Sequence, residues 1–216
     1  MDIDIASFPL WYVAFLFSLT CHEAAHALAA KLGGDLTAYH AGQVSLNPLP
    51  HIQREPWGTV LMPILSFFLS GSCIGWGSAP YDPYWENRYP RRAAWMALAG
   101  PVANVILVLV VGLIMRFGLS GGWFNPVGTL TYSLIVQGTD ATSAGFATFF
   151  SIMFVLNVLL ALFNMMPLPP LDGASVISLL MPADVSEKYR NFIRQPMLQM
   201  FGVLIAMYAV RPFVDD

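Results

Sequence analysis

The segment FPLWYVAFLFSLTCHEAAHALAA, residues 8–30, is apolar over most of its length, yet it contains two histidines and a glutamate. A helix of about 20 predominantly apolar residues is what a bilayer requires of a membrane span. Ionisable side chains inside such a span are costly unless they face a polar or wet interior. The segment therefore predicts a membrane-spanning helix that carries a functional site.

The composition of the whole chain agrees with a membrane protein. Of 216 residues, 56% are hydrophobic and 11% are charged, with a mean hydropathy of +0.61. An average soluble domain carries about 25% charged residues. The net charge is −3, and the absence of a basic stripe excludes nucleic acid as a partner. Cys21 and Cys73 fit no disulfide or zinc-ribbon spacing and are expected to be buried.

Further apolar segments define the predicted architecture. They cover residues 57–76, 93–117, 144–163 and, more briefly, 196–210, while 174–181 is long enough only for a half-helix. Residues Asp35–Pro48 have the β-branched and aromatic composition of a small β-hairpin. We therefore expect residues 1–216 to form a single membrane-embedded domain of the all-α polytopic class. It would contain about four to five transmembrane helices, a re-entrant segment and a small membrane-associated β-hairpin.

Residues His22-Glu23-Ala24-Ala25-His26 form an H-E-x-x-H pattern. On a helix, positions i and i+4 lie on one face, so both imidazoles can bind a single metal ion. Glu23 is close enough to act as a general base on a water at that metal, as in zinc-dependent peptidases.

A catalytic zinc site needs a third protein ligand if one position is to stay open for water. The best candidate is Asp172, which ends the stretch Asn164-Met-Met-Pro-Leu-Pro-Pro-Leu-Asp172. Its three prolines interrupt a helix, and irregular backbone at membrane depth is tolerated only where it lines a cavity or is buried in protein. Taken alone, Asp172 would be better explained as a helix cap. Beside an H-E-x-x-H pattern that lacks a third ligand, the metal-ligand interpretation is favoured.

Together with Ala99-Gly100-Pro101-Val102-Ala103-Asn104, these two motifs resemble the site-2 protease family of intramembrane zinc metalloproteases. The resemblance extends over about 150 residues, from Cys21 to Gly173, and is closest to compact bacterial members without extra domains. It implies one Zn²⁺ per chain, a catalytic Glu23, and metal ligands at His22, His26 and Asp172. The substrate would be a protein cut within or near its own transmembrane helix.

The resemblance also implies that Asn164 holds the substrate backbone. Asn104 is a further candidate for substrate or oxyanion binding, although an interhelical hydrogen bond explains it equally well. The other two histidines, His40 and His51, are expected to be solvated or capping residues. The predicted hairpin at Asp35–Pro48 would offer an edge strand to an unwound substrate.

Charge and parity predict where the site lies. The His pair is near the C-terminal end of the first span and Asp172 follows the end of 144–163, so these two ends must share a membrane face. One intervening segment must therefore not cross, and 57–76 is the favoured one, although it is long enough to cross. Eight of the ten Lys and Arg residues then share one face, against six if every segment crosses. The positive-inside rule places that face in the cytoplasm, so we expect a bacterial cytoplasmic membrane protein with its N-terminus outside and its active site near the cytoplasmic face.

Two other functions fit parts of this pattern. One is a metal-binding membrane scaffold that has lost catalysis. The other is a metal transporter, which is less favoured because transporters usually distribute polar residues over several spans and contain repeats. The lipid bilayer is an expected partner in every case, and the oligomeric state is left open by the sequence.

Overall fold

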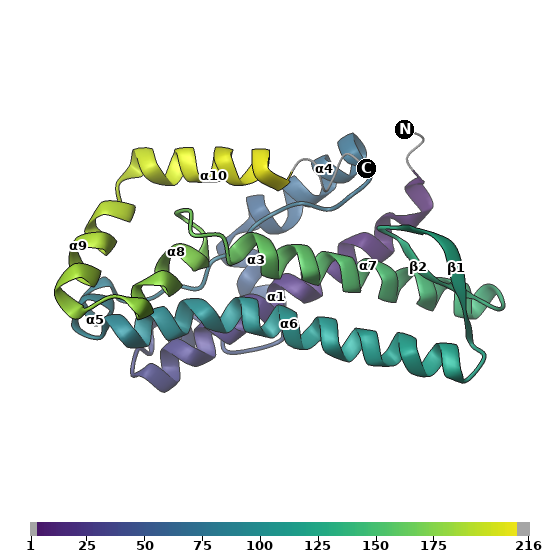
Figure 1. Cartoon of the computed structure of the whole chain (residues 1–216), viewed down its shortest axis with the longest axis horizontal. Helices are drawn as coiled ribbons and strands as arrows, with labels where there is room; N and C mark the ends of the chain where they lie inside the picture. Colours follow the sequence, from purple (N-terminus) through teal and green to yellow (C-terminus); the bar gives the residue numbers. More distant parts are fainter. Residues whose placement is uncertain (1–3, 211–216) are drawn as a thin grey trace. The chain divides into compact units, whose positions relative to one another are not determined.

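A computed structural model describes residues 4–210, most of which are helical (Figure 1). The elements in chain order are η1 (Ile5–Ser7), α1 (Phe8–Gly33), α2 (Thr37–His40), α3 (Leu49–Arg54), η2 (Trp57–Leu61), α4 (Met62–Ser70), α5 (Pro83–Arg88), α6 (Pro90–Ser120), β1 (Phe124–Thr131), β2 (Leu134–Gly138), α7 (Ala141–Asn164), α8 (Asp172–Val176), η3 (Ile177–Leu180), α9 (Ala183–Ile193) and α10 (Pro196–Val210).

Three helices are long and apolar enough to cross a membrane: Ile5–Gly33, Pro90–Ser120 and Ala141–Asn164. They contain the predicted segments 8–30, 93–117 and 144–163, and they identify the chain as a helical integral membrane protein. The other two predicted spans form shorter helices. Helix α10 has 15 residues, or about 22 Å of helix, against a hydrocarbon thickness of about 30 Å. Three helices of the described chain thus meet the length that a crossing requires, and the number of four to five spans stays a prediction.

Two compact units divide the fold. One consists of Met1–Cys21, Leu46–Ser78 and Asn104–Leu159, and the other of His22–Ser45, Ala79–Ala103 and Leu160–Asp216. Helices α1, α6 and α7 each contribute to both units. The half-helix predicted at 174–181 corresponds to α8 and η3, a single short helical stretch in the second unit.

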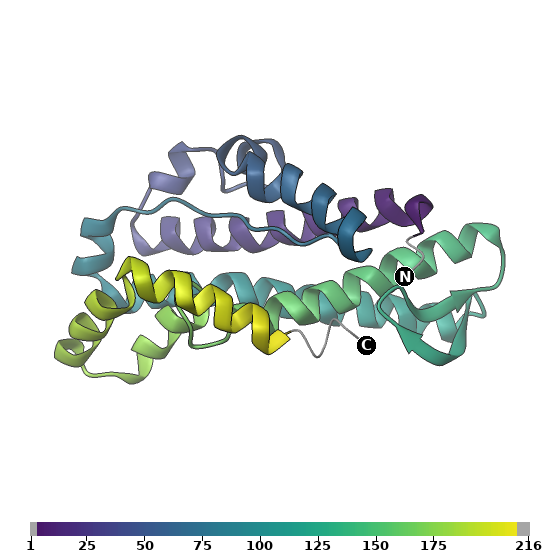
Figure 2. The same cartoon turned by 90° about the horizontal axis from the view of Figure 1, so that it is seen from above.

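In the first unit, residues 57–78 fold back on themselves (Figure 2). Five residues of π-helix and nine of α-helix end at Gly71, whose φ of 77° is left-handed. The following chain returns along the helix: Ile74 N donates to Ser66 Oγ at 2.8 Å, and Trp76 N donates to the Gly58 carbonyl at 3.1 Å. The segment therefore ends beside its own beginning, and a re-entrant position of 57–76 in the membrane stays a prediction.

The hairpin predicted at Asp35–Pro48 is wrong. Asp35 Oδ1 accepts hydrogen bonds from Thr37 N at 2.9 Å and from Thr37 Oγ1 at 2.6 Å, and this local arrangement starts helix α2 instead of a strand. The edge strand that the substrate was expected to use is therefore not formed there.

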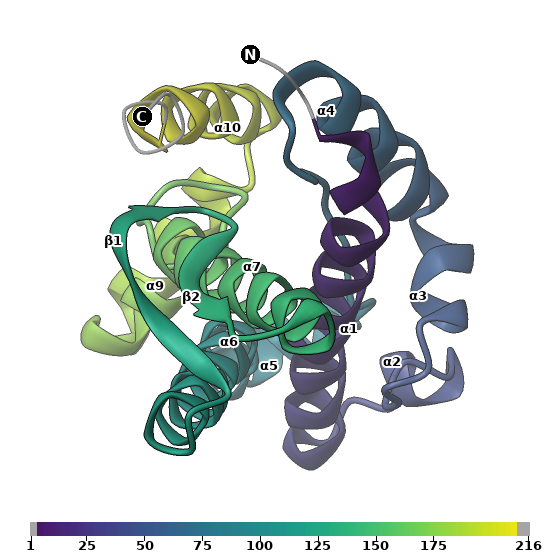
Figure 3. The same ribbon diagram turned by 90° about the vertical axis from the view of Figure 1, so that its right-hand side faces the viewer.

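The sheet of the described chain is the antiparallel pair β1 and β2, between α6 and α7 (Figure 3). Its pairing is irregular between Pro126 and Thr131. Pro126 and Gly128 are residues that argue against a strand in sequence, which explains why this hairpin was not predicted.

The return path of residues 57–78 gives a first prediction. A Cβ atom on Gly75 would overlap the carbonyl oxygen of Gly58 and lie 2.7 Å from Cζ of Phe15. We expect Gly75→Ala to lower the free energy of unfolding by about 1–3 kcal/mol, since overpacking at a close main-chain approach costs this much. Thermal unfolding of the purified protein in detergent measures the effect. Gly145→Ala is the matched control, because a Cβ on Gly145 meets nothing within 4 Å. Equal unfolding temperatures for the two variants would contradict the close return path.

Candidate metal centre

Helix α1 places His22 and His26 on one face, as the i, i+4 spacing requires. Their Nε2 atoms are 3.0 Å apart and their rings meet edge to face at 84°. Both residues are buried, at 4% and 5% exposure. Because their Nε2 atoms are so close, the two imidazoles face a common point inside the second unit.

Asp172 reaches the same point from the other end of the sequence. It is the first residue of α8 (Figure 1), and its Oδ2 atom lies 3.1 Å from His22 Nε2 and 3.3 Å from His26 Nε2. The loop before it is tightly folded, because a Cβ on Gly173 would overlap the main chain of Met165. The proline-rich stretch thereby delivers a carboxylate to the two histidines.

The three atoms fit a small divalent cation. They form a triangle with edges of 3.0, 3.1 and 3.3 Å. A tetrahedral zinc ion with bonds of about 2.0–2.1 Å requires ligand atoms about 3.3 Å apart. Asp172 Oδ2 is also buried, with the two histidine Nε2 atoms beside it, and a buried carboxylate oxygen is unfavourable unless a positive charge compensates it. Residues of this kind at these distances constitute a candidate metal centre.

A main-chain group from α6 orients one of the ligands. His26 Nδ1 lies 2.7 Å from the carbonyl oxygen of Met96. A carbonyl only accepts hydrogen bonds, so Nδ1 carries the proton and Nε2 keeps its lone pair for a metal. Sequence analysis missed Met96, and nothing in its side chain would have indicated a role that its carbonyl performs.

Gly100, one turn further along α6, provides the space for both imidazoles. A Cβ on Gly100 would lie 2.6 Å from His22 Nε2 and closer still to His26 Nε2. The Gly100-Pro101 pair inside a long helix is unusual, and this steric requirement explains the glycine.

The predicted base, Glu23, is buried at 5% exposure beside His22 on α1. Its carboxylate interacts electrostatically with His26. The charge of Glu23 therefore belongs to the same buried polar region as the metal ligands.

The two asparagines have different surroundings. Asn164 ends α7, and its Nδ2 donates to the Leu160 carbonyl at 3.0 Å. Asn104 belongs to the first unit, where its Nδ2 donates to Asn157 Oδ1 at 2.8 Å and Asn157 Nδ2 donates to Ser18 Oγ at 2.8 Å. Asn104 thus makes the interhelical hydrogen bond that was its alternative explanation, and substrate binding by either asparagine stays a prediction.

Of the remaining histidines, His40 is exposed, as expected. His51 is buried in α3 at 3% exposure, so the expectation of a solvated histidine is wrong for it. The burial arises from the packing of the first unit, which the sequence around His51 does not reveal.

The end of the ligand-bearing helix is tied to α5 and α6. The Gly33 carbonyl accepts hydrogen bonds from Trp85 Nε1 and from Arg92 Nη1, both at 3.0 Å. Asp35, two residues after the end of this helix, is held in the same way. Its Oδ2 atom accepts a hydrogen bond from Asp82 N at 2.8 Å. Burial alone would raise the pKa of Asp35, but the hydrogen bonds from Thr37 and Asp82 outweigh it and lower that pKa below its ordinary value. Asp35 is therefore an ionised residue that fixes the end of α1.

Comparison with known proteins assigns this chain to a protein family. The family model that matches residues 10–209 is Peptidase family M50. The chain belongs to this family, the site-2 proteases, as the motifs indicated.

Three curated relatives are each named "Putative zinc metalloprotease". YwhC of Bacillus subtilis is 34% identical over 83% of this chain and 73% of its own length. MJ0611 of Methanocaldococcus jannaschii is 31% identical over 82% of this chain and 73% of its own. Rip2 of Mycolicibacterium smegmatis is 29% identical over 78% of this chain, but the match spans only 56% of Rip2. No solved structure matches the chain.

The packing of Gly100 against the imidazoles gives a second prediction. We expect Gly100→Ala to weaken metal affinity by about 10–100-fold, the range observed when groups supporting a metal ligand are replaced. Metal content after dialysis against graded chelator measures it. Gly112→Ala is the control on the same helix, because a Cβ there makes only an ordinary contact, 3.5 Å from Phe154. Equal metal retention in both variants would show that Gly100 does not confine the site.

Asp35 gives a third prediction. We expect Asp35→Asn to lower the free energy of unfolding at pH 7 by about 1–3 kcal/mol, because hydrogen bonds to a charged acceptor are lost. Since folding lowers the pKa of Asp35, its stabilisation is complete above the ordinary value and is lost as the pH falls through the lowered pKa. The difference in unfolding temperature between wild type and Asp35→Asn should therefore shrink below about pH 4. A difference that is unchanged down to pH 2 would exclude an ionised Asp35 as its source. Glu187→Gln, which removes an exposed carboxylate, controls for the loss of charge.

Proposed function

We propose that this protein is an intramembrane zinc metalloprotease that hydrolyses a peptide bond within or near the transmembrane segment of another membrane protein. The observation that carries the proposal is the convergence of His22, His26 and Asp172 on one point, with both histidines on a helix that is apolar and long enough to span a membrane. Membership of Peptidase family M50 and the names of the relatives support the same activity.

The residues of the chain have distinct roles in this proposal. His22, His26 and Asp172 would hold one Zn²⁺, which when bound lowers the pKa of a coordinated water to about 7 and polarises the carbonyl of the scissile bond.

Glu23 would accept the proton of the attacking water and deliver it to the leaving amine. Its burial keeps bulk water from competing for that proton. The Met96 carbonyl holds His26 in the required tautomer, and Asn164 is expected to bind the substrate backbone.

A transmembrane substrate must unwind before it can be cut. In a helix each amide is bonded to the carbonyl four residues earlier, so the scissile carbonyl is not accessible to water. The proposed enzyme therefore acts on a locally extended segment of its substrate.

We also propose that the active site lies near the cytoplasmic face of a bacterial membrane. Support comes from the path of residues 57–78, whose two ends lie together and so leave an even number of crossings between the His pair and Asp172. With this path, eight of the ten Lys and Arg residues share one face, which the positive-inside rule assigns to the cytoplasm. Arg211 is counted on the opposite face only if residues 196–210 cross the membrane, and it lies outside the described residues.

Glu23→Gln tests the catalytic role. The variant should retain its metal, because no ligand is changed, and should lose proteolysis by at least about 100-fold, since general-base catalysis contributes 10²–10⁴-fold. The measurements are metal content and a comparison of membrane proteomes from cells that express the wild type or the variant, followed by cleavage of the accumulated protein in proteoliposomes. Glu187→Gln is the control for removal of a glutamate.

The alternatives give different results in the same system. A catalytically lapsed scaffold would bind metal while the wild type cleaves nothing. A transporter would move Zn²⁺ into proteoliposomes. Cleavage that persists undiminished in Glu23→Gln would refute the mechanism.

A further inference from the structure

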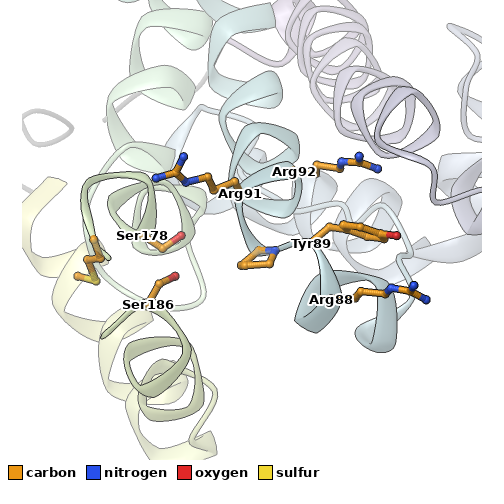
Figure 4. Close-up of a pocket in the computed structure, with 8 residues that line it drawn as sticks. Arg88, Tyr89, Arg91, Arg92, Ser178 and Ser186 are labelled. Atoms are coloured by element: carbon orange, nitrogen blue, oxygen red, sulfur yellow. The ribbon is translucent and has the colours of Figure 1, made fainter. Parts of the chain in front are cut away.

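A cavity of about 280 Å³ lies in the second unit, between the start of α6 and the segment formed by η3 and α9 (Figure 4). None of the candidate metal ligands lines it, and no step of the proposed hydrolysis uses it. Its walls carry guanidinium, hydroxyl and phenol groups, from Arg88, Tyr89, Arg91, Arg92, Ser178 and Ser186.

The three arginines that line the cavity differ in the contacts that their guanidinium groups already make. Arg92 donates to the Gly33 carbonyl and lies 4.4 Å from the centre of the Tyr89 ring, and Arg88 lies 5.5 Å from that ring. Figure 4 shows both pointing away from the serines, whereas Arg91 extends toward the side of Ser178. Among the side chains that the structure describes, Arg91 has no hydrogen-bond or ion-pair partner. None of the described side chains therefore occupies the donors of its guanidinium, which can bind a ligand.

The opposite wall adds a donor that is hydrogen-bonded to a further arginine, which does not itself line the cavity. The hydroxyl oxygen of Ser186 accepts a hydrogen bond from Arg190 Nη1 at 3.0 Å, so the hydroxyl proton of Ser186 is left to donate. Arg190 is only 4% exposed.

The described acidic groups nearby do not cancel this charge. Glu86 is paired with Arg194, and the exposed Glu187 interacts electrostatically with Arg190. Neither carboxylate is paired with Arg91. The cavity is therefore suited to an anion.

The position of the cavity on α6 indicates where that anion comes from. Arg91 lies in the first turn of a 31-residue candidate span, where main-chain N–H groups and the helix dipole also favour an anion. Trp95, one turn further along, is 61% exposed, which is typical of the membrane–water interface. Acidic lipids are concentrated on the cytoplasmic leaflet, and basic pockets between helices bind their headgroups.

We propose that this cavity binds the phosphate group of an acidic phospholipid, with Arg91 as its main ligand and Ser186 as a second donor. Its volume is below the range of about 300–1,000 Å³ that encloses drug-sized ligands, so a headgroup fits better than a nucleotide. Guanidinium and phosphate form bidentate, charge-assisted hydrogen bonds.

The bound headgroup has a structural consequence for the metal centre. Helix α6 carries Met96 and Gly100, and η3 directly follows α8, which begins at Asp172. A phosphate that bridges Arg91 and Ser186 would hold together the two segments that supply these parts of the site. Binding itself does not depend on proteolytic activity.

Thermal unfolding of the full chain in a neutral detergent tests the proposal. Short-chain phosphatidylglycerol should raise the unfolding temperature in a saturable way, and short-chain phosphatidylcholine should not. Arg91→Gln should weaken the apparent affinity for phosphatidylglycerol by about tenfold, the loss expected for hydrogen bonds to a charged group. Arg91→Lys should lose less, and Ser186→Ala should also weaken binding. Arg116→Gln, which removes an arginine from the other unit, should respond like the wild type.

The outcomes separate the proposal from its alternatives. Equal stabilisation by the two lipids, or an equal response of Arg91→Gln and Arg116→Gln to phosphatidylglycerol, would overturn it. If inorganic phosphate at the same concentration gave the same Arg91-dependent shift, the lipid would be overturned as the source of the anion. Because Arg91 is exposed and has no partner among the described side chains, its replacement should leave the unfolding temperature without lipid unchanged.

Discussion

The meeting of two imidazoles and one carboxylate in an apolar surrounding is the constraint on which the second unit depends. Buried charges are unfavourable unless they are compensated, and the buried Oδ2 atom of Asp172 faces the Nε2 atoms of both histidines. The charge of Asp172 has to be compensated by a positive charge beside it, and a cation held by Asp172 and both imidazoles meets this requirement. The interruption of the helix after Asn164 follows from this requirement, because a continuous helix could not bring Asp172 to the histidines of α1.

Several glycines allow a helix or loop to approach its neighbours closely in both units. Gly100 lets α6 contact the imidazoles, and a Cβ on Gly202 of α10 would overlap the Pro169 carbonyl in the loop that leads to Asp172. In the first unit, Gly58 and Gly75 allow residues 57–78 to return along themselves. Without a strong hydrophobic driving force between helices in lipid, packing through small residues is the main source of helix association. The glycines of this chain are thus part of what holds the site.

The local part of this site could be predicted from sequence, and the part that depends on tertiary packing could not. The spacing of His22 and His26 is set by the helix itself, and Asp172 could be found because the site lacked a ligand. Met96 contacts His26 through its main-chain carbonyl, so the identity of its side chain could not indicate this contact. The burial of His51 and the partner of Asn104 depend on how helices are rotated against each other. The hairpin was predicted in the wrong place for two reasons. The side chain of Asp35 starts a helix, and Pro126 in β1 is a residue that argues against a strand in sequence.

Distances along two helices bear on how water reaches such a site. His26 precedes Lys31 by five residues, and Met96, whose carbonyl binds His26, follows Arg92 by four. At 1.5 Å per residue these separations are about 6–8 Å of helix. Charged side chains at the ends of membrane helices extend to the interface, so the proposed metal centre would lie about one to one and a half turns below it, well short of the bilayer midplane at about 15 Å. In the proposed function, water would need only a short path to the site, and the substrate helix would supply its scissile bond near one of its ends.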